Sequence, residues 1–153
     1  MGGTLLKTLA GGGLLLAVGV TLAFAGAADD AIKGRQGCMK AHGATMQVLG
    51  PMAKGEAAFD AAAMQAAFAN EETACAGWDS WWGEDTQTGE SVETYAKPEI
   101  WTDQEGWKAA GGAWYQAYID TKAAADEAAF KAAFPALGQS CGGCHEKFRR
   151  PKG

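Results

Sequence analysis

The segment Cys141-Gly142-Gly143-Cys144-His145, close to the carboxyl end, carries the strongest signal in this sequence. It follows the Cys-x-x-Cys-His pattern through which c-type haem is attached to a polypeptide. Two thiols three residues apart on a helix can each form a thioether with one vinyl group, and the adjacent imidazole can bind the iron. The pattern predicts one covalent haem c per chain, held by Cys141 and Cys144, with His145 as the proximal axial ligand.

A Cys-x-x-Cys pair has two other common uses, a redox disulfide and half of a zinc site. The redox use normally has a βαβ context, which this chain lacks. A zinc site needs a second pair of ligands, and His42 with Cys38 or Cys75 is a poor substitute for one. The haem interpretation is therefore favoured.

The length of 153 residues suits one domain, and 18 acidic against 13 basic residues give a formal charge of −5. A surface that binds phosphate backbones would be basic, so nucleic acid is not expected as a partner.

The first 27 residues differ from the rest of the chain. Their only charge is Lys7, and the uncharged run from Thr8 to Ala27 ends in Ala23-Phe24-Ala25 and Ala25-Gly26-Ala27. A basic start, an apolar middle and small-x-small triplets predict a signal peptide over residues 1–27, cleaved after Ala25 or Ala27. An uncleaved membrane anchor is the alternative, because about 20 apolar residues can span a bilayer.

Residues 28–153 then form the exported, periplasmic domain, with 12 basic against 18 acidic residues and a formal charge of −6. This domain has only two valines and three isoleucines but many alanines, which argues against sheet and for helix. The predicted fold class is all-α, an antiparallel four-helix bundle with the covalent haem near the last helix.

Four helices are expected. The first covers residues 29–49. Asp29 and Asp30 are placed to interact favourably with the positive end of the helix dipole, and Gly50-Pro51 is expected to end the helix. The second covers 60–78 with Asp60 as N-cap, the third begins with a Thr102–Glu105 capping box, and the fourth begins near Asp126 and bends at Pro135. Residues 79–101 between them are predicted to be a long irregular loop, a kind of segment that often covers a ligand.

A haem motif at the end of a four-helix chain with a leader resembles the class II c-type cytochromes, the cytochrome c′ family. Three stretches carry the resemblance, which covers nearly all of residues 29–150. They are Ile32-Lys33-Gly34-Arg35-Gln36-Gly37-Cys38-Met39-Lys40, Pro98-Glu99-Ile100-Trp101-Thr102-Asp103, and the set Phe134, Gly138, Cys141, Cys144, His145 and Arg149.

The resemblance implies roles for three polar residues. Arg35 matches the arginine that pairs with a haem propionate, with a salt bridge to another helix as the alternative. Gln36 would bond the other propionate. Tyr95 occupies a haem-contacting position where the family usually has a shorter polar or acidic residue.

Met39 lies one turn after Arg35, where the resemblance implies the residue that overhangs the distal side of the iron. In cytochrome c′ the distal residue crowds a five-coordinate iron, whereas in low-spin relatives a methionine there ligates it. Core filling is the other interpretation of Met39, and His42, one turn further on, is a rival ligand.

Cys38 and Cys75 are extra to the family pattern. Antiparallel pairing of the first two helices places Cys38 opposite residue 72, within one turn of Cys75. An exported protein favours oxidation, so a disulfide is predicted, with two buried free thiols as the alternative.

The predicted function is electron transfer with periplasmic redox partner proteins. A five-coordinate protein that binds nitric oxide or carbon monoxide is the alternative, and an enzyme is not expected because no Arg–His distal pair is apparent. The resemblance also implies a homodimer that pairs through the first two helices.

Overall fold

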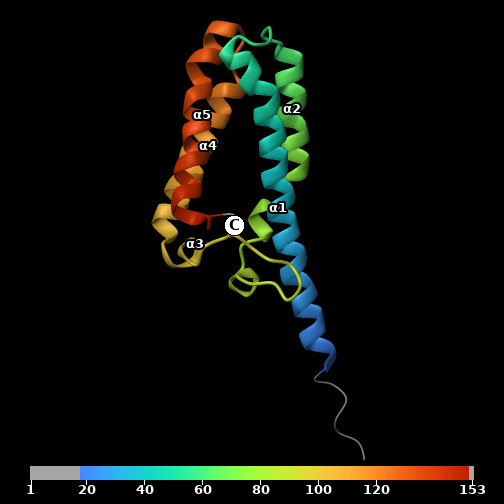
Figure 1. The fold of residues 1–153 in the computed structure, drawn as a ribbon. Helices are drawn as coiled ribbons and strands as arrows, with labels where there is room; N and C mark the ends of the chain where they lie inside the picture. The colour runs from blue at the N-terminus through green and yellow to red at the C-terminus, as the bar shows by residue number, and fades with distance from the viewer. Residues whose placement is uncertain (1–17, 152–153) are drawn as a thin grey trace, which may run out of the picture.

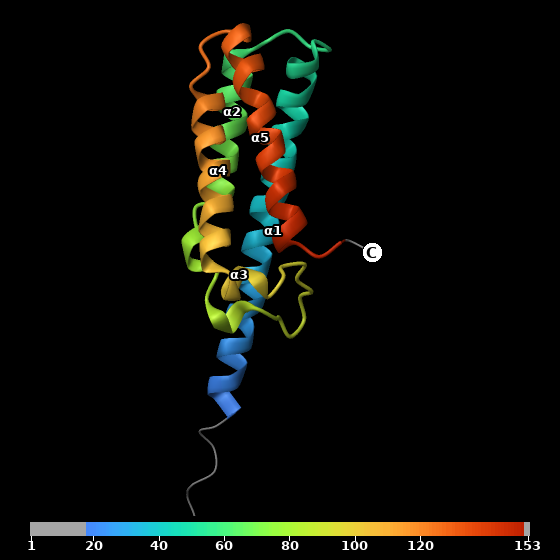
Figure 2. The ribbon, with the colours of Figure 1, turned by 90° about the vertical axis from the view of Figure 1, so that its left-hand side faces the viewer.

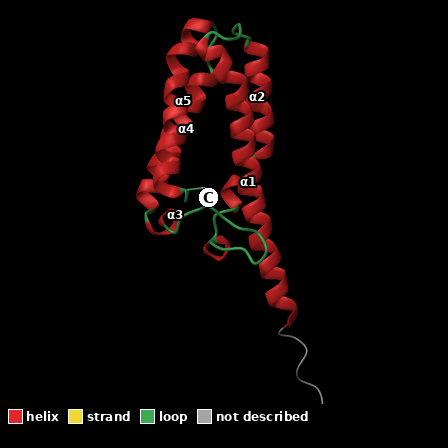
Figure 3. Cartoon of the chain, viewed as in Figure 1, coloured by secondary structure: helices red, strands yellow, loops and turns green. Residues whose placement is uncertain are grey.

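The computed structural model describes residues 18–151, with side chains from residue 26 onward, and the described part is dominated by four long helices (Figure 1). These are α1 (Val18–Lys54), α2 (Ala61–Ala74), α4 (Gln104–Lys122) and α5 (Glu127–Phe148). Shorter elements are η1 (Trp78–Ser80), η2 (Glu84–Thr86) and α3 (Glu99–Thr102). No strand is present among the described residues, only an isolated bridge between Ala96 and Arg149 (Figure 3).

The long helices run alternately up and down. α1 packs along α2 and α4 along α5, and the two pairs lie side by side (Figures 1 and 2). The short α1–α2 and α4–α5 connections lie at one end of the bundle, and the long connection from α2 to α4 lies at the other. The predicted all-α antiparallel four-helix bundle is confirmed.

Helix α1 differs from its prediction at its carboxyl end, because it continues through Gly50-Pro51 to Lys54. The helix stops at Gly55, whose φ of +74° is the left-handed conformation open to glycine. Its N–H donates to the Met52 carbonyl at 3.2 Å, and the Glu56 N–H donates to the Pro51 carbonyl at 2.9 Å. These two bonds form a Schellman motif, so the stop signal was Gly55 and the proline lies within the last turns.

Aspartates begin the other three long helices. The Asp60 carboxylate accepts from the Ala63 N–H at 3.0 Å, which confirms the predicted N-cap. Asp126 caps α5 in the same way, since its carboxylate accepts from the Ala129 N–H at 2.8 Å. At α4 the predicted capping box is wrong. Asp103 is the N-cap and accepts from Gly106 at 2.9 Å, because Thr102 already belongs to the last turn of α3.

Helices α5 and α2 also differ from their predictions. α5 runs through Pro135 as one uninterrupted helix. α2 ends at Ala74, four residues before the predicted end. Just after this helix the Trp81 ring packs against Gly77, where a side chain would collide with it.

The hydrophobic core fills the half of the bundle near the two short connections. It joins the end of α1, the start of α2, the end of α4 and the first half of α5 through Leu49, Met52, Met64, Phe68, Ala117, Tyr118, Ala124, Phe130 and Leu137. In the other half the described residues bury few large apolar side chains, chiefly Ile32, Ile100 and Phe148. That second half contains the carboxyl end of α5 and the long loop.

Asp29 anchors the long loop on α1. It was predicted to act at a helix start, but it lies inside α1 and is buried. Its carboxylate accepts hydrogen bonds from the Ser91 hydroxyl and from the Ser91 and Val92 N–H groups, the latter two at 3.2 and 3.3 Å. The Ser91 hydroxyl is the main reason that the pKa of Asp29 lies below its usual value.

Residues 1–17 of the predicted signal peptide lie outside the described residues, and α1 begins at Val18. Within the described part of the chain, no helix combines the length and apolar character needed to span a membrane.

Candidate functional site

The Cys141–His145 motif occupies the last turns of α5. Cys141 and Cys144 are free, half-buried thiols, whereas Gly142 and Gly143 between them are exposed. Cysteines three residues apart share one helix face, and Cys141 lines a small internal cavity together with His42, Met46 and Trp114. The motif therefore turns its sulfurs toward the inside of the bundle and its glycines toward solvent.

Burial is the main influence on these thiols. It raises the pKa of both Cys141 and Cys144, and the Glu71 carboxylate raises that of Cys141 further. His145 follows on the same end of the helix and is half-buried. The structure thus brings the three predicted haem-attachment residues to one stretch of α5.

The long loop is fastened to the residues just after the motif. The Lys97 N–H donates to the Phe148 carbonyl at 3.0 Å, and the Arg150 N–H donates to the Tyr95 carbonyl at 2.7 Å. The Arg150 guanidinium also lies 5.9 Å from the centre of the Tyr95 ring. Tyr95 is therefore held beside the carboxyl end of α5.

Arg35 is the most unusual residue of this half of the bundle, since it is a cation that is only 4% exposed. The Cζ atom of its guanidinium lies 4.7 Å from the ring centre of Trp82 and 5.7 Å from that of Trp101. Nη2 donates to the Thr86 carbonyl at 2.6 Å. Among the described residues, Nε and Nη1 have no hydrogen-bond partner. Burial lowers the pKa of Arg35 to about 10.

Buried N–H groups without a partner are costly, and a guanidinium forms strong charge-assisted hydrogen bonds with carboxylates. The unpaired N–H groups of Arg35 therefore fit a negatively charged acceptor such as an oxygen of a haem propionate. The salt bridge to another helix, the alternative for Arg35, is not found among the described residues. The chain fits haem at this point.

Gln36 and Met39 lie on α1 around Arg35. Gln36 donates from Nε2 to the Glu93 carbonyl at 2.7 Å and thus holds the loop. Met39 is 38% exposed, and it is not among the residues that line the cavity at Cys141. The structure places Gln36 at the loop and Met39 nearer to solvent than Arg35.

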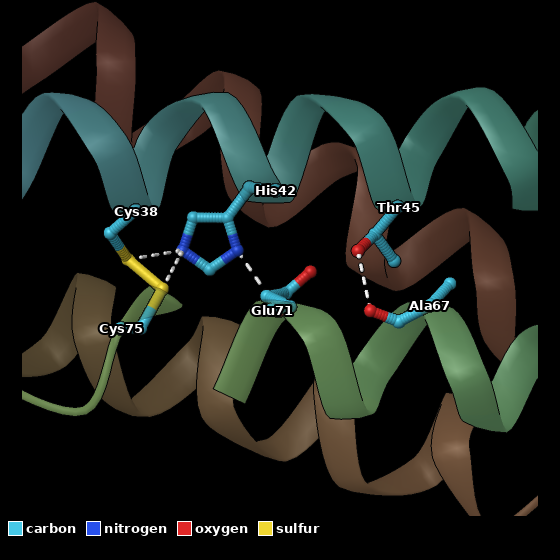
Figure 4. Close-up of a disulfide and its surroundings, with 6 residues drawn as sticks. All are labelled: Cys38, His42, Thr45, Ala67, Glu71 and Cys75. Carbon is cyan, nitrogen blue, oxygen red and sulfur yellow. Dashed lines mark hydrogen bonds and ion pairs between the residues drawn. A yellow bond between two sulfur atoms is a disulfide. The ribbon is translucent and has the colours of Figure 1, made fainter. Parts of the chain in front are cut away.

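Cys38 and Cys75 form a disulfide that joins α1 to the residue following α2, with a Cα–Cα distance of 4.8 Å (Figure 4). His42 lies beside it, with Nε2 3.4 Å from Cys38 Sγ and 3.9 Å from Cys75 Sγ. Its Nδ1 lies 2.9 Å from a carboxylate oxygen of Glu71. Both nitrogens of His42 therefore face groups of α1 and α2.

Sequence reasoning missed three partners of these residues. Thr86 and Trp82 surround Arg35 from the loop, and no local pattern shows this. Glu71 had a signal, because it shares the inner face of α2 with Met64, Phe68 and Cys75 by helical spacing. A buried acid on such a face predicts a polar partner across the helix pair.

Comparison with known proteins points to one family. The family model described as Cytochrome C′ matches residues 30–149. The cytochrome c′ of Alcaligenes xylosoxydans xylosoxydans is 32% identical over 127 residues, which cover 81% of this chain and 96% of that protein. The cytochrome c-556 of Agrobacterium fabrum is 32% identical over 128 residues, covering 79% and 82%.

A solved structure has the same fold. It is a ferrous variant of cytochrome c prime from Alcaligenes xylosoxidans with bound NO, and it matches with a TM-score of 0.65 and 30% identity. The match covers 82% of this chain and 97% of that one.

Proposed function

The chain belongs to the cytochrome c′ family and binds one covalent haem c, and from this premise we propose that it is a periplasmic electron carrier. In this proposal Cys141 and Cys144 provide the two thioether sulfurs and His145 provides the proximal imidazole. The observation that supports haem at this end of the bundle is Arg35, a buried cation whose Nε and Nη1 have no partner among the described residues.

When bound, haem c supplies an iron centre that accepts and releases one electron. Arg35 would hold a propionate through an unpaired N–H group, while the Thr86 carbonyl fixes the position of the guanidinium. The rings of Trp82 and Trp101 cover the guanidinium and exclude water from it. Exclusion of water strengthens the pairing of the two charges.

Gln36 and Tyr95 support the same end of the site. Gln36 holds the loop through the Glu93 carbonyl, and Tyr95 is held at the end of α5 by Arg150. We assign both as contacts to the haem edge.

Met39 is assigned as the sixth ligand. A methionine side chain has three rotatable bonds and adapts its shape readily, so it can turn from its exposed position toward the bundle interior. Methionine opposite histidine is the ligand pair of electron-transfer cytochromes c and raises the reduction potential. The relationship to a cytochrome c-556 is compatible with this role.

A second candidate function is binding of a small gas. It is favoured by the related cytochrome c prime structure that holds NO. In that case Met39 would stand near the iron without ligating it, and nitric oxide or carbon monoxide would be the ligand.

Haem attachment is tested by mass spectrometry of the denatured protein. The wild type is expected to keep the mass of one haem in denaturant, and the Cys141→Ala/Cys144→Ala variant is expected to lose it. Haem that can be extracted from the denatured wild type would contradict attachment through these cysteines.

Export is tested by amino-terminal sequencing of the protein from a periplasmic fraction. We propose that residues 1–27 are a signal peptide, so the mature chain should begin at Gly26 or Ala28. A chain that keeps Met1 and stays with the membrane fraction would instead support an uncleaved anchor.

The net charge and an exposed apolar side chain indicate two kinds of protein partner. The mature charge of −6 favours redox proteins that present a basic face. We also propose a homodimer through α1 and α2, where α1 exposes the hydrophobic side chain of Val48. Light scattering of the haem-loaded protein should give twice the mass of one chain.

A further inference from the structure

The Cys38–Cys75 disulfide has an imidazole and a buried carboxylate directly beside it (Figure 4). His42 is one turn after Cys38 on α1, and Glu71 is one turn before Cys75 on α2. The ligand atoms Cys38 Sγ, Cys75 Sγ and His42 Nε2 all lie within 4.8 Å of one another. None of these residues belongs to the Cys141–His145 motif.

We propose that this cluster, when its disulfide is reduced, binds one zinc-like divalent cation through Cys38 Sγ, Cys75 Sγ and His42 Nε2. Two thiolates and an imidazole form a ligand set that zinc prefers, and a water molecule can complete four-coordination. The site is therefore a redox-controlled metal site on the α1–α2 pair.

The distances support three-point coordination. Zinc–sulfur bonds of about 2.3 Å and zinc–nitrogen bonds of about 2.0–2.1 Å, at tetrahedral angles, separate a sulfur from a nitrogen by roughly 3.5 Å. His42 Nε2 already lies 3.4 Å from Cys38 Sγ and 3.9 Å from Cys75 Sγ. Only the two sulfurs must move apart, to roughly 3.8 Å, and reduction removes the bond that holds them together.

Glu71 prepares the histidine for this role. Its carboxylate is buried and lies 2.9 Å from His42 Nδ1, so it holds the Nδ1 proton and leaves the Nε2 lone pair facing the sulfurs. A carboxylate on the far nitrogen is the usual support of a zinc-bound histidine, because it orients the ring and raises its basicity.

Burial is graded across the cluster. Cys38 is only 1% exposed, whereas Cys75 and His42 are half-buried. A reductant can therefore reach Cys75 first, and a cation can enter from the same side.

The chemistry balances with a dithiol as the reductant. The dithiol gives two electrons and two protons and becomes a disulfide, while the Cys38–Cys75 bond breaks and two thiols form. Binding of the cation then releases the two thiol protons to solvent.

The test uses the haem-loaded protein, reduced with dithiothreitol and freed of it under argon. After addition of zinc and gel filtration, elemental analysis should find one zinc per chain in the reduced protein and none in the oxidised protein. Zinc-edge X-ray absorption should show two sulfur ligands at about 2.3 Å and at least one nitrogen ligand at about 2.0–2.1 Å.

Variants then test the ligands in a competition titration against a zinc chelator. Glu71→Gln should weaken zinc binding about ten- to a hundredfold, and His42→Ala should weaken it more. Glu72→Gln changes the neighbouring acid, which bonds Tyr118 and Lys122 instead, and should leave the affinity unchanged.

The wild type alone can overturn the proposal, so it does not depend on a variant that folds. Alkylation must first show two free thiols in the reduced, haem-loaded chain. Zinc that is then not retained, or is retained equally by the Cys38→Ser/Cys75→Ser variant, would contradict the site. Four free thiols would instead contradict haem attachment, which keeps the two proposals distinguishable.

Discussion

Arg35 places a positive charge inside the half of the bundle that contains the haem motif. A buried cation favours the reduced iron, which carries less positive charge, so Arg35→Leu should lower the reduction potential. Two unit charges about 10 Å apart at an effective dielectric constant of about 20 interact with an energy of about 1–2 kcal/mol. For a one-electron couple this energy corresponds to a potential shift on the order of 40–90 mV. Potentiometric titration measures this shift.

Two control variants separate charge from other effects of the substitution. Arg35→Lys keeps the charge and should leave the potential close to that of the wild type. Lys33→Gln removes an exposed charge from the same helix and should also have little effect, because solvent screens it. Equal potentials in Arg35→Leu and Lys33→Gln would show that Arg35 does not interact with the haem.

Asp29 is expected to hold the long loop against α1. Asp29→Ala removes the acceptor of the Ser91 and Val92 N–H groups, so hydrogen exchange at these two amides should become much faster. Asp30→Ala is the matched control, since Asp30 is exposed and pairs only with Lys33 one turn away. Equal protection of the two amides in both variants would contradict this role.

The stability contributed by Asp29 should depend on pH. Its folded-state pKa is lowered, chiefly by the Ser91 hydroxyl. The contribution is then fully present above the unfolded pKa of about 4 and is lost as the pH falls through the lowered folded value. The difference in unfolding free energy between wild type and Asp29→Ala should be constant near neutral pH and shrink below about pH 4.

At the level of the helices, substitutions of Gly55 and Gly43 should have opposite effects on stability. Gly55→Ala places a side chain at φ +74° and should destabilise the protein by about 1–2 kcal/mol. Gly43 lies inside α1 and a Cβ there would meet no other group, so Gly43→Ala should stabilise the protein by about 0.5–1 kcal/mol. Urea unfolding of the haem-loaded protein measures both, and effects of the same sign would contradict the helix boundary.

The disulfide should stabilise the α1–α2 pair. Its cysteines are 37 residues apart, and closure of a loop of that length contributes about 4 kcal/mol through the entropy of the unfolded chain. Reduction of the wild type should lower the free energy of unfolding by about this amount, whereas the Cys38→Ser/Cys75→Ser variant should not respond to reductant. A response of the double variant would mean that another group is being reduced.

The helices could be predicted where the signal is local. The cap at Asp60 and a helix start near Asp126 could be predicted because a carboxylate before an apolar run needs no distant partner. The end of α1 was predicted too early, because Gly50-Pro51 was interpreted as the stop signal and the helix continues to Lys54. The start of α4 was predicted at the wrong residue because Thr102 belongs to α3.

The site could be predicted only in part for the same reason. The motif in α5 and the arginine one turn before Met39 are sequence patterns, and the structure places them in one half of the bundle. Which groups surround Arg35 depends on how residues 75–98 fold back, and this is decided by contacts such as Trp82 and Thr86 over α1.

For the whole molecule, the described residues divide the bundle into two halves. A packed hydrophobic core joins the helices near the short connections, and a half with Arg35, several tryptophans and the haem motif lies near the long loop. The first half keeps the fold together, and the second is where we propose that the haem binds.

The electron-carrier proposal rests on Met39 as the sixth ligand, and the electron paramagnetic resonance spectrum of the ferric protein tests this most directly. Wild-type protein should be low-spin, and Met39→Ala should become high-spin. A wild-type spectrum that is wholly high-spin and unchanged by Met39→Ala, in a protein that takes up carbon monoxide readily once reduced, would contradict electron carriage and favour gas binding.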